Sequence, residues 1–158
     1  MSKCTQKTVT DMPPRGIYVL LIKIGRKTLE IGALGKICFE GEYAYVGSDQ
    51  RGGRLERHCR KEKPKKWHID CLTNEGEVLG AWVMPLPKSA ESELAEFLAD
   101  RFPVTKGFGN SDCRDAGHLF KVDERLEDSV AEFASHKGVA YMWWVQNSKN
   151  CPASMKNA

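Results

Sequence analysis

Residues 16–24 read GIYVLLIKI, a long and mostly apolar segment. A glycine followed by a run of mostly apolar and β-branched side chains is typical of a buried strand. Residues 42–46, EYAYV, predict another strand, which ends at Gly47. Between the two, residues 28–40 contain short apolar stretches separated by Gly32 and Gly35, and this pattern predicts a hairpin. We therefore expect a sheet built from segments that are neighbours in the sequence.

The rest of the chain predicts helices alternating with further strands. A helix is expected to begin near Arg54 and to end by Pro64, because proline disfavours a helical residue ahead of it. The other expected elements are a short semi-apolar stretch over residues 67–72, a strand over 78–84, a helix over 90–102 with Ser89 as its N-cap, a loop over 103–117, a strand over 118–122 and a helix over 124–136. The fold class is therefore α/β (α+β), with a small, mainly antiparallel central sheet flanked by helices.

The length and composition are those of one globular domain. The chain has 158 residues, of which 41% are hydrophobic and 28% charged. We expect a flexible N-terminal arm over residues 1–15, a single domain over 16–145 and a tail over 146–158, although residues 141–145 are too apolar to belong to a free tail. No run of residues approaches the roughly 18 apolar ones that a membrane span needs. This composition excludes a membrane protein, a collagen-like chain, a coiled coil and a multidomain machine.

The cysteines and the N-terminus indicate where the chain resides. The six cysteines form no Cys-x-x-Cys pair, and residues 1–16 contain no apolar segment of the kind found in secretory leaders. A disulfide framework is therefore not expected, and the cysteines are predicted to be reduced. These features predict a cytoplasmic protein.

Positive charge is concentrated in one window. Between Arg51 and His68 there are eight basic and two acidic residues, so this window carries +6 and the rest of the chain −3, for a total of +3. The basic residues are Arg51, Arg54, Arg57, Arg60, Lys61, Lys63, Lys65 and Lys66. Such a window indicates either a polyanionic partner, most commonly phosphate, or a solvated helix face.

Three short motifs follow one another in a fixed order. Gly16-Ile17-Tyr18 opens the first predicted strand, Tyr45-Val46-Gly47 closes a later one, and Arg54-x-x-x-His58 lies on the helix that follows. A further predicted helix carries Glu91. Taken together, this ordered set resembles the GIY-YIG endonuclease family. Most of that family has a short gap between the first two motifs, whereas here residues 19–44 intervene and the expected hairpin accounts for the difference.

Further motifs are similar to one small GIY-YIG-like subfamily, known as an uncharacterised domain that occurs alone or fused to DNA-repair enzymes. The resemblance covers about residues 14–122. Its motifs are Gly32-x-x-Gly35, residues 43–48, Arg57-His58-x-Arg60, residues 67–70, residues 111–113 and residues 118–120. Asp115 stands where the subfamily often has a second cysteine.

The resemblance implies a metal-dependent endonuclease that hydrolyses phosphodiester bonds. Glu91 would hold Mg²⁺ or Mn²⁺, with Glu93 as the rival ligand on the other side of the helix. Arg54 would bind the scissile phosphate, and Tyr18 would orient or deprotonate the attacking water. To act as a base, Tyr18 needs nearby cations that lower the pKa of its hydroxyl. Tyr45 and His58 would support this network. Gly16 and Gly47 are the motif glycines.

The basic window would then bind DNA, or alternatively RNA. The residues expected to contact the nucleic acid are Arg57, Arg60, Lys65, Lys66 and His68, with Trp67 or His68 stacking on a base. Zinc held by Cys113 and His118, with His68 or Asp70 as a further ligand, is disfavoured against a buried cysteine and a hydrogen-bonded histidine, because Cys-x-x-x-x-His is not a diagnostic spacing.

Two other functions remain open at this stage. The first is a nucleic-acid-binding module with a degenerate, inactive nuclease site, a reading that Asp115 supports. The second is a protein-interaction domain that uses the apolar residues 141–145.

Overall fold

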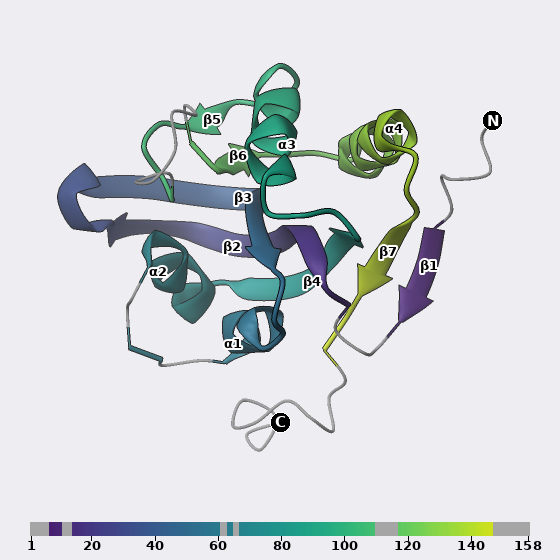
Figure 1. The fold of residues 1–158 in the computed structure, drawn as a ribbon. Helices are drawn as coiled ribbons and strands as arrows, with labels where there is room; N and C mark the ends of the chain where they lie inside the picture. The colour runs from purple at the N-terminus through teal and green to yellow at the C-terminus, as the bar shows by residue number, and fades with distance from the viewer. Residues whose placement is uncertain (1–6, 11–13, 61–62, 65–66, 110–116, 147–158) are drawn as a thin grey trace.

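The computed structural model describes the chain except for residues 1–6, 11–13, 61–62, 65–66, 110–116 and 147–158. The described residues form a mixed α/β domain around a seven-stranded, mostly antiparallel sheet with strand order β1-β7-β4-β2-β3-β6-β5 (Figure 1). The strands are β1 (Lys7–Thr10), β2 (Gly16–Glu30), β3 (Lys36–Asp49), β4 (Glu77–Met84), β5 (Val104–Thr105), β6 (Leu119–Lys121) and β7 (Tyr141–Trp144). The helices are α1 (Arg54–Cys59), α2 (His68–Glu75), α3 (Ala90–Ala99) and α4 (Leu126–Lys137), with one 3-10 turn, η2 (Gly32–Leu34). The fold class predicted from the sequence is confirmed.

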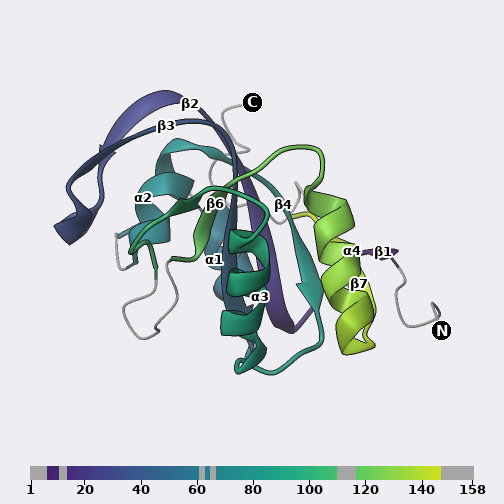
Figure 2. The same ribbon diagram turned by 90° about the horizontal axis from the view of Figure 1, so that it is seen from above.

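The long hairpin of β2 and β3 forms the centre of the sheet. Its strands are longer than the sequence predicts, because residues 36–39 and 42–46 belong to one continuous β3. Gly41 joins them with φ +108°, a left-handed conformation that glycine adopts without strain. Near its open end, Gly16 pairs with Asp49 and Tyr18 pairs with Gly47. Figure 2 shows the closed end of the hairpin curving away from the rest of the domain.

Helices cover both faces of the sheet. α3 and α4 lie on one face, and α1 and α2 lie on the other (Figures 1 and 2). Along β2, Ile17 and Val19 enter the core beneath α3 and α4, whereas Tyr18, Leu20 and Ile22 enter the core beneath α1 and α2. A strand buried on both faces needs apolar residues on both faces, which explains the almost uninterrupted apolar run of residues 16–24.

The two ends of the described chain meet at one edge of the sheet. Residues 1–15 were expected to form a loose arm, but Lys7–Thr10 form β1, which pairs in parallel with β7. Trp143 of β7 fits above Gly80, where an ideal Cβ would lie 2.4 Å from the indole ring. Residues 68–75 form α2, where the sequence predicted only a short semi-apolar stretch over residues 67–72. None of the helices in the described part of the chain is long and apolar enough to span a membrane.

Candidate active site

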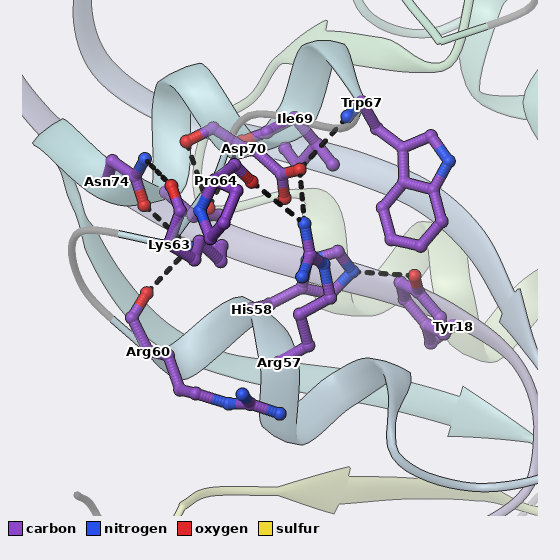
Figure 3. A network of polar contacts seen from close by, with 11 residues as sticks. Tyr18, Arg57, His58, Arg60, Lys63, Pro64, Trp67, Ile69, Asp70 and Asn74 are labelled. Atoms are coloured by element: carbon purple, nitrogen blue, oxygen red, sulfur yellow. Dashed lines mark hydrogen bonds and ion pairs between the residues drawn. The ribbon is translucent and has the colours of Figure 1, made fainter.

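The site begins with a buried contact between two motif residues. The hydroxyl of Tyr18, on β2, lies 2.8 Å from Nε2 of His58, on α1 (Figure 3). Both side chains are buried, with exposed fractions of 0% and 1%. Gly47 makes room for the tyrosine, because an ideal Cβ at this position would lie only 2.4 Å from the Tyr18 hydroxyl. Gly16 is required for a similar reason, since a Cβ there would collide with the carbonyl oxygen of Met84.

Burial keeps both partners of this contact neutral. It lowers the pKa of His58 from 6.5 to about 3, and the positive charge of Lys63 adds to the effect. Burial also raises the pKa of Tyr18 well above 10, with nearby Tyr45 acting in the same direction and the Arg54 guanidinium opposing it. For Tyr18 to act as a base, its pKa would have to be lowered. The direction found here favours a hydrogen-bonding phenol over a phenolate.

Asp49 fixes the loop that leads into α1. Its buried carboxylate accepts three backbone N–H groups, from Gly52 at 2.7 Å, Arg54 at 2.9 Å and Leu55 at 3.0 Å. The bonds from Arg54 and Leu55 satisfy N–H groups at the start of α1, which have no partner within the helix itself, and the bond from Gly52 fixes the loop ahead of it. Asp49 was not predicted as a site residue, although an aspartate ahead of a Gly-Gly turn is a common turn signal. Its position directs the Arg54 side chain toward the pocket described next.

A pocket of about 570 Å³ opens beside this loop, and we call it the basic pocket. It is lined by residues 48–54 together with Arg57, Trp67 and Lys88. The guanidinium groups of Arg54 and Arg57 lie over the Trp67 ring, 4.9 and 5.0 Å from its centroid. The sequence predicted Arg54 and Arg57 for this region, but it did not predict that Lys88 would join them.

A buried carboxylate holds part of the pocket wall in place (Figure 3). Asp70 is fully buried and lies 2.7 Å from Nη2 of Arg57. It also accepts the backbone N–H of Trp67 at 2.9 Å, which caps the start of α2. Arg57 makes a further hydrogen bond to the carbonyl of Pro64. One acidic side chain therefore orients both Arg57 and the segment that carries Trp67.

Glu91 and Glu93 point to different neighbours. Glu91 lies 3.7 Å from Nδ1 of buried His118, and its side chain is 13% exposed. Its charge also contributes to the raised pKa of Tyr18. Glu93, 55% exposed, forms an ion pair with Lys137 of α4 at 2.5 Å. Of the two candidate metal ligands, Glu91 is therefore the one near the motif residues.

The topology explains why residues on α1 and α3 meet. β3 and β4 both pair antiparallel with β2, so they run in the same direction and their C-terminal ends lie side by side with the start of β2 between them. α1 follows β3 and α3 follows β4, on opposite faces. The Gln50 amide bonds to the Leu86 carbonyl at 3.0 Å, and this contact joins the two connections. The five motif residues therefore gather at this end of the central strands: Tyr45, Arg54 and Glu91 all act electrostatically on Tyr18, and the Tyr45 ring lies 6.1 Å from that of His58.

Other predicted residues have different surroundings. His68 packs on Phe108 with ring centroids 5.4 Å apart, and its Nδ1 accepts the Gly109 N–H at 3.0 Å. Arg60 is exposed, outside the lining of the basic pocket. Lys63 is buried and donates to the Arg60 carbonyl and to Asn74, so it contributes little to a basic surface. Lys65, Lys66 and Cys113 lie outside the described residues.

A divalent cation is compatible with Glu91. No group of three or more His, Cys, Asp or Glu side chains suited to a metal is found among the described residues. Mg²⁺ does not require such a group, because it commonly keeps several waters and binds through one or two carboxylates together with substrate phosphates. Glu91, partly exposed beside the motif residues, provides an oxygen ligand of this kind.

The fold and this cluster define an α/β domain with a polar site at the ends of two strands. The family described as "Domain of unknown function DUF123" matches residues 17–139, and the chain belongs to this family. The match leaves β1 and β7 outside it. No significant match was found among curated proteins or among solved structures.

Proposed function

We propose that this chain is a metal-dependent endonuclease that hydrolyses phosphodiester bonds in DNA. One observation carries the proposal: the candidate phosphate-binding arginine, the candidate metal-binding carboxylate and the two motif tyrosines gather at one end of the central strands, although they come from four separate elements. The basic pocket adjoins them. A cytoplasmic location and a role in DNA repair or recombination belong to the same proposal.

Arg54 is suited to bind the scissile phosphate. It lines the basic pocket, and within the described residues it has no carboxylate partner. A guanidinium stays charged and can donate two parallel hydrogen bonds to phosphate oxygens. Glu91 would hold Mg²⁺ or Mn²⁺ near that phosphate, and the bound ion would neutralise charge on the phosphate and the leaving oxygen.

The two tyrosines take different roles in this proposal. Tyr18 is fully buried and its pKa is raised, so we assign it a positioning role through His58 rather than proton abstraction. Tyr45 is only partly buried, and its side chain is therefore the better placed of the two to meet substrate or water.

The test is cleavage of a panel of branched, nicked and single-stranded DNAs by the purified chain with Mg²⁺ or Mn²⁺. We expect Arg54→Ala and Glu91→Gln each to lose roughly 100-fold or more in rate, the usual cost of removing one group that stabilises the transition state. Glu93→Gln is the matched control, because it removes a carboxylate from the same helix turn that faces Lys137 instead. No cleavage by the unmodified chain, or equal rates for all variants, would contradict the proposal.

A nucleic-acid-binding module with an inactive site is the second candidate. It is favoured by the raised pKa of buried Tyr18, which leaves the site without an evident base at that position. This candidate predicts DNA binding that falls steeply with salt, persists in Glu91→Gln, and is accompanied by no cleavage in any variant.

A further inference from the structure

The basic pocket has the size of a site for one small molecule. Its volume of about 570 Å³ falls within the roughly 300–1,000 Å³ of typical ligand pockets. Its walls come from separate parts of the chain: the loop after β3, the start of α1, the residue before α2 and the segment before α3. A concave site of this kind can enclose one nucleotide, whereas the stacked bases of an intact duplex cannot enter it.

The side chains that line the pocket carry an excess of positive charge, which favours binding of an anion. Arg51, Arg54 and Lys88 have no ion pair with any described residue. The carboxylate of Asp49, which accepts three backbone N–H groups, contributes one negative charge, and these three cations exceed it. Arg57 is already paired with Asp70. The remaining positive charge suits a phosphate group.

Trp67 supplies the second element of recognition. Its ring is partly exposed and is contacted by two guanidinium groups. Aromatic rings and guanidinium planes both stack on unpaired bases, and such stacking tolerates any base. Because Asp70 fixes both Arg57 and the backbone of Trp67, this surface is held in position before a ligand binds.

We propose that the basic pocket binds one unpaired nucleotide of a DNA strand. Arg54 and Lys88 bind its phosphate, and its base stacks on the surface formed by Trp67 and Arg57. The substrate of the proposed nuclease is then DNA with a single-stranded segment, such as a flap, a gap or a frayed end, rather than continuous duplex. This inference rests on the proposed function only for the identity of DNA as the ligand.

The test measures binding without cleavage. Fluorescently labelled oligothymidine and a blunt duplex of the same length are titrated with the chain in EDTA, and anisotropy gives each Kd. We expect oligothymidine to bind at least tenfold more tightly than the duplex. Trp67→Ala and Lys88→Ala should each weaken oligothymidine binding at least fivefold, whereas Trp67→Phe should retain most of it. Arg125→Ala, an exposed arginine just before α4, is the control and should change nothing.

The outcomes separate this inference from the proposed function. Equal affinity for the two DNAs, or oligothymidine binding unchanged in both Trp67→Ala and Lys88→Ala, overturns the pocket assignment even if the chain cleaves DNA. Preference for oligothymidine with the expected variant effects supports it even if no cleavage is found. Thymidine monophosphate that competes as strongly as the oligonucleotide would assign the pocket to a free nucleotide and overturn the proposal.

Discussion

Acidification should destabilise this protein through His58. The folded pKa of His58, about 3, lies below the value of 6.5 that an exposed imidazole has. Below pH 6.5 the unfolded chain takes up a proton that the folded chain excludes, so the unfolded state gains free energy of protonation. The stabilising contribution of the neutral histidine is therefore complete above pH 6.5 and is lost progressively as the pH falls toward 3.

The size of the effect follows from the two pKa values. Each pH unit in this window removes about 1.4 kcal/mol from the free energy of unfolding. Between pH 7 and pH 5 the loss from His58 is about 2 kcal/mol. With a urea m-value of about 2 kcal/mol/M, the unfolding midpoint should fall by about 1 M.

The assay is urea unfolding at pH 7 and pH 5, followed by circular dichroism, for the unmodified chain and for His58→Gln. Carboxylates common to both proteins contribute equally, so the difference between their pH responses isolates the histidine. His136→Gln, at an exposed position on α4, is the matched control and should respond to pH as the unmodified chain does. If His58→Gln does not fold, the pKa of His58 measured by NMR in the unmodified chain replaces it. The same pH response in the unmodified chain and the variant, or an NMR pKa near 6.5, would show that burial of His58 does not make the protein sensitive to acid.

Three further changes test the packing around the site by urea unfolding. Asp49→Ala removes the acceptor of three backbone N–H groups and should lower the free energy of unfolding by about 2–4 kcal/mol. An unchanged unfolding midpoint would show that water replaces the carboxylate. Gly47→Ala should lower the free energy of unfolding by about 1–3 kcal/mol, because its Cβ would collide with the buried Tyr18 hydroxyl. Gly25→Ala is the control, since no atom lies within 4 Å of the Cβ it adds, and equal losses in the two variants would count against the collision. Asp70→Asn weakens a buried ion pair and should cost about 2–4 kcal/mol, while Asp123→Asn, in an exposed pair, should leave the midpoint unchanged.

The sequence predicted the elements whose signals are local. Residues 16–24 were recognisable as a strand because a strand buried on both faces must be apolar throughout. The continuity of β3 was missed, since a glycine such as Gly41 between two short apolar stretches is typical of a turn. Only the backbone conformation shows that this glycine bends the strand without ending it.

Elements that depend on distant partners were not predicted. β1 is polar and short, and it exists as a strand because it pairs with β7 more than 100 residues away in the sequence. α2 was not assigned as a helix because the stretch recognised in the sequence, residues 67–72, is semi-apolar and too short to show a helical period. Its start is stabilised by the Asp70 carboxylate, which accepts the Trp67 N–H.

In the candidate site, too, residues with a local sequence signal were predicted and those that depend on distant contacts were not. The ordered motifs identified Tyr18, Arg54, His58 and Glu91 because each lies at a recognisable position in its element. Lys88 was missed because its proximity to Arg54 depends on how two connections meet in space. The direction of the Tyr18 pKa shift was also beyond the sequence, since it depends on how completely the side chain is buried.

The length of the hairpin does not disturb the site, for a geometric reason. Residues 19–44 separate the two tyrosine motifs, yet Tyr18 pairs directly with Gly47. In an antiparallel hairpin, residues added at the turn lengthen both strands and leave the register at the open end unchanged. The turn at η2 lies at one end of β2 and β3, and the site lies at the other end, where Gly16 pairs with Asp49. The arrangement of the candidate site therefore depends on the register of the open end and on the two connections that leave it, and not on the length of the distal hairpin.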